Sequence, residues 1–258
     1  MSKHNALQMF GRSGNPALND ATFSNFSSSD SLGGSFMTLQ GTVNKTGILL
    51  LLVTLSAALT WNLYFEYRDT SAVMPLGIGG AIIGFILAIV TMFKPSWSAI
   101  TSPAYALAQG LFLGAISAIF ESQYQGIVIQ AVGLTLGTLS SLLLLYKTGI
   151  IKPTENFRLM IVSATMGIAL LYAVSIIMNM FGSDIGFIHS NGLFGIGFSL
   201  FVVAIAALNL VLDFDFIEQG SEQNAPKYME WFGAFSLMVT LIWLYLEMLR
   251  LLAKLRSR

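Results

Sequence analysis

Cysteine is absent from this 258-residue sequence, and charged residues are scarce at 10%. Without cysteine there is no disulfide framework, no thiolate metal site and no cysteine nucleophile. An ordinary soluble domain carries about 25% charged residues, which keep its surface polar. The formal net charge is zero. That argues against a nucleic-acid partner, because proteins that bind nucleic acid usually present a clustered basic face.

Apolar residues make up 55% of the chain and occur in long runs. A helix needs about 20 residues to cross roughly 30 Å of hydrocarbon, and lipid offers no partner for open backbone groups. The runs are too long for the strands of a membrane barrel, and polar residues do not alternate within them. We therefore predict an all-α, polytopic membrane protein with seven spanning helices. The runs are Gly47–Phe65, Val73–Phe93, Ala104–Phe120, Ile127–Tyr146, Leu159–Phe181, Phe194–Leu212 and Phe232–Leu252.

Residues 1–44 differ in kind from the rest of the chain. They include the serine run Ser27–Ser29 and the pair Gly33-Gly34, with little apolar periodicity. Such a segment cannot bury enough apolar surface to offset the entropy lost when it becomes ordered. It also lacks the early apolar core of a secretory signal. We predict a flexible soluble tail over residues 1–44 and a seven-helix transmembrane domain over residues 45–258.

The basic residues of the loops predict the orientation, because Lys and Arg collect in short cytoplasmic loops. Lys45 precedes the first run, Lys94 follows the second, and three more basic residues lie in or near the fourth loop. The N-terminus and the even-numbered loops are therefore expected in the cytoplasm. The basic end of the chain conflicts with this, because seven spans would place it outside. The side of the C-terminus stays open.

Three Gly-x-x-x-Gly motifs lie inside apolar runs. Glycines four residues apart share one helix face and let another helix approach closely. They indicate either a dimer interface or packing within one bundle, and the second is favoured because seven helices make many internal contacts. The motifs are Gly80/Gly84, Gly110/Gly114 and Gly133/Gly137.

Ionisable side chains at membrane depth are the candidates for function, because each costs at least about 2.5–3.5 kcal/mol to insert. Asn209 and Asp213 share a helix face, whereas Asp215 lies about 200° around the helix from Asp213. Glu247 lies well inside the last run, within ion-pair reach of Arg250. We select these five residues as a candidate ion path. The alternatives are a solvated helix end for the two aspartates and a structural ion pair for Glu247.

The same residues carry a resemblance to a known family. The pattern Leu-x-Leu-Asp213 closing a late helix, and Leu244–Leu252 (LYLEMLRLL) near the chain end, resemble the transmembrane Bax inhibitor motif family. Residues 37–46 (MTLQGTVNKT), 209–220 and 226–254 are similar to its bacterial branch with a long N-terminal tail. The resemblance implies a seven-helix bundle with the last helix central, in a bacterial cell membrane.

The resemblance also implies a pH-sensitive calcium leak in which two carboxylates on the last two helices share a proton-sensitive contact. Asp213 takes the place of one family aspartate. Glu247 takes the place of the other, a departure that adds one methylene. Two carboxylates in contact cannot both stay ionised at low dielectric. Calcium prefers hard oxygen ligands, and two carboxylates would make only a weak, transient calcium site. No other cofactor is expected.

No enzyme motif is evident, since the glycine loop with lysine, His-Glu-x-x-His and Gly-x-Ser-x-Gly are all missing. No enzymatic activity is expected. Two functions remain. The first is a proton-gated cation leak through Asp213 and Glu247, with the lipid bilayer, calcium ions and protons as partners. The second is an interaction protein that regulates a membrane protease or a stress response through the tail.

Overall fold

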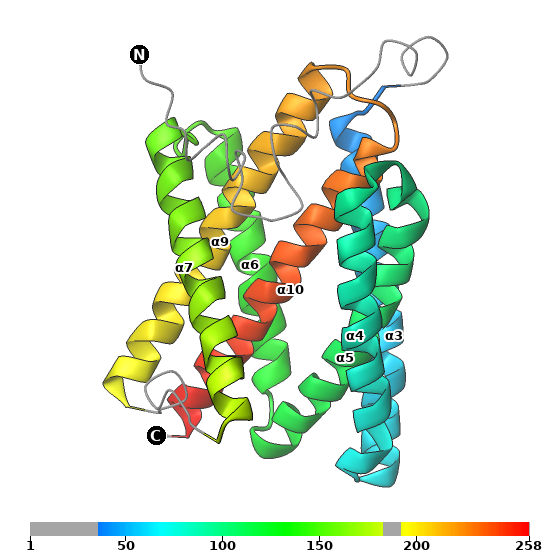
Figure 1. Cartoon of the computed structure of the whole chain (residues 1–258), viewed down its shortest axis with the longest axis vertical. Helices are drawn as coiled ribbons and strands as arrows, with labels where there is room; N and C mark the ends of the chain where they lie inside the picture. Colours follow the sequence, from blue (N-terminus) through cyan, green and yellow to red (C-terminus); the bar gives the residue numbers. More distant parts are fainter. Residues whose placement is uncertain (1–35, 183–191, 258) are drawn as a thin grey trace. The chain divides into compact units, whose positions relative to one another are not determined.

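The structure, a computed structural model, describes residues 36–182 and 192–257. Within these residues, seven helices are long and apolar enough to cross a membrane, and the prediction of an all-α polytopic membrane protein is confirmed. A short 3-10 turn, η1 (Pro95–Trp97), precedes the third of them. The helices, labelled in Figure 1, are α3 (Leu39–Tyr67), α4 (Thr70–Phe93), α5 (Ser98–Gln123), α6 (Ile127–Lys147), α7 (Glu155–Met180), α9 (Leu193–Glu222) and α10 (Met229–Arg256).

Helix α3 begins earlier than the predicted boundary of the tail. Residues 39–44, which the sequence places in the tail, form its first turns. The reason is a side-chain cap, because the Thr38 hydroxyl accepts a hydrogen bond from the Gly41 N–H at 3.0 Å and satisfies one of the open donors of the first turn. The rest of the predicted tail, residues 1–35, lies outside the described residues.

Helix α9 is longer than its apolar run. It continues past Asp213 to Glu222, and the amide of Gln219 donates to the Asp215 carboxylate at 2.7 Å within this polar extension. The expectation that Asp213 closes its helix is therefore wrong. Asp213 lies inside α9, because polar side chains that bond one turn apart continue the helix beyond the apolar segment.

The last helix is the most buried of the seven. In α10, 78% of the apolar window is buried, against 61% in α9, 50% in the span that contains α5 and 17–22% in the other four. Helices with little burial leave their apolar side chains available to lipid. A helix with this much burial is packed on most of its sides, as the resemblance implies for a central last helix.

Chain contacts divide the molecule into two compact units. Among the described residues, unit 1 contains residues 129–182, 192–214 and 240–257, and unit 2 contains residues 36–128 and 215–239. Unit 1 therefore includes most of α6, all of α7, and the parts of α9 and α10 that carry four of the five selected residues. Unit 2 includes α3, α4 and α5, and the segments that flank the turn between α9 and α10.

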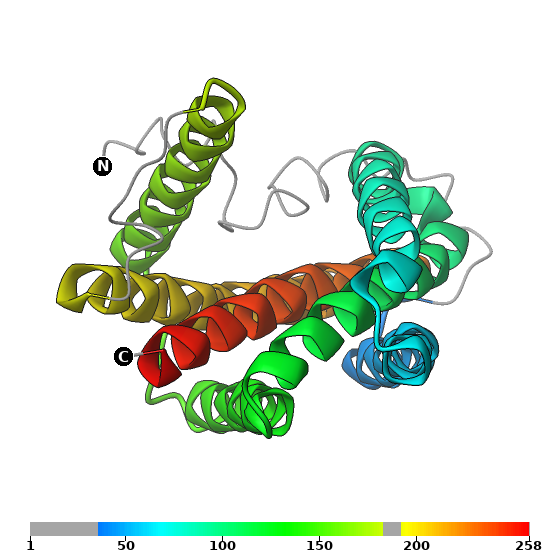
Figure 2. The same cartoon turned by 90° about the horizontal axis from the view of Figure 1, so that it is seen from below.

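In unit 2, α5 packs along both α3 and α4, as Figure 2 shows from below. Glycine makes this approach possible. A Cβ on Gly114 would overlap the backbone of Ala57 in α3, and one on Gly80 would overlap the Ala108 carbonyl in α5. A Cβ on Gly110 would overlap the Ser56 hydroxyl and the Val53 carbonyl of α3, whereas one on Gly84 would meet only the flexible side chain of Gln109. Two of the three glycine motifs thus lie at helix contacts within the chain.

The third glycine motif differs from the first two. A Cβ on Gly133 or Gly137 of α6 would meet nothing within 4 Å. This face of α6 therefore makes no close helix contact that depends on glycine, although its spacing is the same as in the other two motifs.

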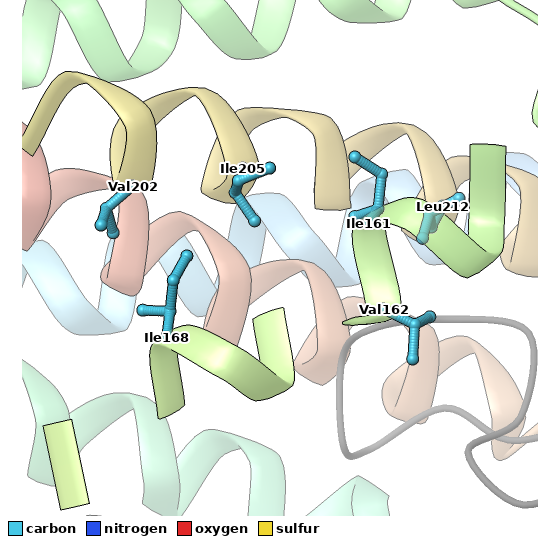
Figure 3. Close-up of a cluster of buried hydrophobic side chains, with 6 residues drawn as sticks. All are labelled: Ile161, Val162, Ile168, Val202, Ile205 and Leu212. Carbon is cyan, nitrogen blue, oxygen red and sulfur yellow. The ribbon is translucent and has the colours of Figure 1, made fainter. Parts of the chain in front are cut away.

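The apolar core of unit 1 lies between α7 and α9. Branched side chains interlock there, and Trp243 of α10 packs against them. Such β-branched residues fill space with few rotamers, so they hold the two helices at a defined distance. The core residues drawn in Figure 3 are Ile161, Val162, Ile168, Val202, Ile205 and Leu212.

Candidate ion path along α9 and α10

In unit 1, α9 and α10 run side by side in opposite directions, and two side-chain contacts define their register. The Thr240 hydroxyl donates to the Asp213 carboxylate at 2.6 Å, and the Lys254 ammonium donates to the Ser199 hydroxyl at 2.8 Å. The two residues on each helix are 14 positions apart, or about 21 Å along the axis. The helices therefore stay in register over most of a membrane thickness.

Asp213 and Asn209 form the first polar level of this interface. Asp213 is fully buried and Asn209 is 1% exposed. The Asn209 amide donates to the Thr165 hydroxyl of α7 at 2.8 Å and to the Ile205 carbonyl at 2.9 Å. Its own oxygen, Oδ1, is buried and accepts no hydrogen bond from the described residues. The shared helix face predicted for Asn209 and Asp213 thus points into the protein.

Glu247 forms the second level, with a side chain 2% exposed. Its Oε1 accepts hydrogen bonds from the Tyr172 hydroxyl of α7 at 3.0 Å and from the Arg250 guanidinium at 2.7 Å. Arg250 also donates to the Tyr172 hydroxyl at 2.8 Å. Glu247 Oε2 is buried and has no hydrogen-bond partner in the described part of the chain. The ion pair that the sequence allows between Glu247 and Arg250 is present.

The two levels are separate along the helix axis. Glu247 lies seven residues beyond Thr240, the partner of Asp213, which corresponds to about 10 Å along α10. Asn209 lies about 6 Å along α9 from Asp213, on the side of the Glu247 level. Thr240 donates to Asp213, whereas Tyr172 and Arg250 donate to Glu247. Both levels also bond to α7, through Thr165 and Tyr172, so the polar groups lie where α7 meets α9 and α10.

Asp215, the fifth selected residue, belongs to unit 2. Its carboxylate is half-buried and accepts from the Gln219 amide one turn further along α9. This fits the alternative given for it above, an aspartate in the polar end of a helix.

Sequence reasoning missed three residues of the site, namely Thr240 and Lys254 of α10 and Tyr172 of α7. Thr240 and Lys254 lie seven residues before and after Glu247, a spacing of nearly two helical turns that places all three on one face. This heptad spacing was a usable signal. Tyr172 lies on a different helix with no local pattern, so only the tertiary structure identifies it.

A third buried carboxylate, Glu230 of unit 2, was also missed. Its fully buried side chain forms ion pairs with Lys45 and, at 2.8 Å, with Lys227. It also accepts from the Thr38 N–H at 3.0 Å and the Thr38 hydroxyl at 2.9 Å. A Cβ on Gly41 would overlap this carboxylate. Glu230 therefore ties the start of α3 to the start of α10, with both of its oxygens satisfied.

The described residues contain no group of three or more His, Asp or Glu side chains that could together hold a metal ion. The two buried carboxylates of unit 1 therefore do not belong to such a group. Asp213 has a hydroxyl donor, and Glu247 has a guanidinium and a phenol.

Comparison with known proteins places the chain in a family. A family model described as Bax inhibitor 1 like matches residues 11–257, nearly the whole sequence. Neither the comparison with curated proteins nor the one with solved structures found a match. The resemblance predicted from the last two helices is confirmed, and the chain belongs to the Bax inhibitor 1 like family.

Proposed function

We propose that this protein is a pH-sensitive calcium leak whose path follows the α9–α10 interface of unit 1. The supporting observation is a pair of buried oxygens, Glu247 Oε2 and Asn209 Oδ1, that have no hydrogen-bond partner in the described residues. A buried, unsatisfied polar group costs about 1–3 kcal/mol, so one in a native interior is expected to bind a water or an ion. Membership of the family is consistent with this role.

The chemistry of these groups suits a weak calcium path. Calcium takes carboxylate and amide oxygens as ligands, and both kinds face the interface at Asp213, Asn209 and Glu247. Arg250 neutralises part of the Glu247 charge through Oε1. It leaves Oε2 open for a passing cation. No third carboxylate joins them among the described residues, which favours passage over tight storage.

Protonation would control such a path. An ionised carboxylate attracts a cation, and a protonated one does not, so calcium flux should rise with pH. The charged and titratable groups around Glu247 are Tyr172 from α7 and Arg250 from its own helix, which both donate to it, and Lys254 of α10, whose charge it attracts. Protonation of Glu247 would also weaken its ion pair with Arg250 and release that cation toward the path, which opposes calcium entry further.

The test is calcium flux into proteoliposomes that hold the purified full-length protein, measured over a pH series. Asp213→Asn and Glu247→Gln are each expected to flatten the pH dependence and lower the flux at high pH. If both carboxylates act on one path, the double variant should do little more than either single variant. Asp215→Asn is the matched control, because Asp215 lies outside the interface, and should behave as the unmodified protein.

The proposal fails if either single variant keeps the full pH dependence, or if the Asp215→Asn control loses it to the same extent. Fully additive effects of the two variants would show that the carboxylates act independently. Absence of calcium flux at every pH would show that the protein is not a calcium leak.

We infer that the N-terminus lies in the cytoplasm, from Lys45, Lys94 and the basic fourth loop. The resemblance to the bacterial branch supports an inner membrane as the location. The basic end of α10 no longer weighs against this orientation. Lys254 is buried and donates to Ser199, and Arg256 donates to Gln130 at 2.9 Å, so both serve the fold. Protease added to sealed inside-out vesicles should remove the tail, whereas intact spheroplasts should protect it. Cleavage in spheroplasts would show that the N-terminus lies outside the cytoplasm.

A further inference from the structure

The ends of α3 and α5 in unit 2 surround a hollow that the proposed leak does not use. Its volume of about 660 Å³ lies within the range of about 300–1,000 Å³ typical of small-molecule sites. The α3 wall consists of Trp61, Tyr64, Phe65 and Arg68. Their spacing of three and four residues places them on one helix face. Trp61 and Phe65 have ring centroids 5.0 Å apart.

The α5 wall is polar and well ordered by hydrogen bonds. The Tyr64 hydroxyl donates to the Ser122 hydroxyl at 2.9 Å and joins the two walls. Glu121 accepts from the Gly126 N–H at 2.5 Å and the Val128 N–H at 3.1 Å. These bonds hold the turn between α5 and α6, and they orient the carboxylate. A carboxylate has about four lone-pair sites, so Glu121 can still accept a further donor.

The hollow has one group of each charge. Arg68 follows the last residue of α3, and its side chain is exposed. No residue in the described ranges 36–182 and 192–257 forms an ion pair with its guanidinium. A free cation on one wall and an oriented anion on the other match a ligand that has both an anionic and a cationic group.

The hollow also lies at a particular depth. Helix α3 has 29 residues, or about 43 Å at 1.5 Å per residue, which exceeds the roughly 30 Å of hydrocarbon. Its last turns therefore reach the membrane–water interface, where Trp and Tyr rings gather. Phe65 is 39% exposed beside the opening. A phospholipid suits this depth, because its acyl chains lie in the bilayer and its charged head group lies at the surface.

We propose that the hollow between the ends of α3 and α5 binds the head group of a zwitterionic phospholipid of the ethanolamine class. The phosphate is held by Arg68, whose guanidinium suits phosphate oxygens. The ammonium is held by Glu121, with the rings of Trp61 and Phe65 available for cation–π contact. This site is independent of the proposed calcium leak.

Native mass spectrometry of the full-length protein in mild detergent tests the site, with phosphatidylethanolamine and phosphatidylglycerol titrated separately. Phosphatidylethanolamine should bind about tenfold more tightly, through the added charge-assisted contact. Arg68→Gln should weaken it by about tenfold for the same reason. Lys94→Gln is the charge-matched control, because Lys94 lies over Trp97 at the opposite end of the helices, and should leave binding unchanged.

Glu121→Gln tests the contact with the ammonium group apart from the contact with the phosphate. The amide oxygen can still accept a hydrogen bond in the α5–α6 turn, so the variant should lose the preference for phosphatidylethanolamine but keep its binding of phosphatidylglycerol. If this variant does not fold, Arg68→Gln decides the matter, since the guanidinium supports no other described contact.

Three results would overturn the proposal. Equal affinity for the two lipids would show that the hollow does not hold the ammonium group. Unchanged binding in Arg68→Gln would show that Arg68 does not hold the phosphate. Competition by free phosphoethanolamine at the same concentration as the lipid would show that the hollow takes a soluble zwitterion.

Discussion

Gly114→Leu is expected to destabilise the protein severely, and Gly114→Ala by about 1–3 kcal/mol, the usual cost of overpacking. A Cβ at this position would overlap backbone atoms of Ala57 and the hydroxyl of Thr60 in α3. Backbone atoms cannot rotate away as a flexible side chain can, so α3 and α5 would have to separate. Helix contacts in lipid depend on close packing, and this contact would be lost. The measurement is the melting temperature in detergent.

The chain provides a matched control for this experiment. Gly137→Leu makes the same exchange in α6, where a Cβ meets nothing within 4 Å. Leucine also favours the helix over glycine by up to about 1 kcal/mol, so this variant should melt at the same temperature or slightly higher. If Gly114→Ala has the same melting temperature as the unmodified protein, the α3–α5 contact is looser than in the structure.

Glu230→Gln is expected to lower the free energy of unfolding by about 3 kcal/mol, as when one partner of a buried ion pair is removed. The substitution keeps the shape of the side chain beside Gly41 but leaves Lys45, whose side chain is 16% exposed, without its anion. Lys45→Met should cost less, because Lys227 still neutralises Glu230. The free energy can be measured by equilibrium unfolding with SDS in mixed micelles.

A double-mutant cycle shows whether the pair itself carries the effect. Lys45→Met combined with Glu230→Gln should cost less than the two single losses together, because the only charge left without its partner is that of Lys227, which is 48% exposed. Glu66→Gln, at an exposed position in the last turns of α3, is the control and should change stability by less than about 0.5 kcal/mol. A loss in Glu230→Gln no greater than in this control would mean that the ion pair does not hold α3 to α10.

Glu230 and Glu247 illustrate why the candidate site could be predicted only in part. Both are buried glutamates of α10. Glu247 was noticed because it interrupts an apolar run, and its pair with Arg250 is local. Glu230 precedes the apolar run and looks like an ordinary charge at a helix end. Its main partners, Lys45 and Thr38, lie about 190 residues earlier in the chain, and no local pattern connects residues so far apart.

The sequence by itself determined the seven helices, because a spanning helix satisfies its own backbone and needs only a sufficiently long apolar run. It also indicated Glu247 as a candidate site residue, since this charge interrupts an apolar run. The last two helices were enough to indicate the family. These properties are local, and each can be read from a window of about 20 residues.

Only the tertiary structure decided which helix faces meet protein and which remain open to lipid. Both environments are apolar, so the same Gly-x-x-x-Gly spacing occurs at the tight contacts of Gly110/Gly114 and on the open face of Gly133/Gly137. It also decided the register of α9 against α10, which places Asp213 beside Thr240 and places Glu247 beside Tyr172 of α7. Register depends on contacts between residues distant in the chain, and the period of a single helix contains no information about them.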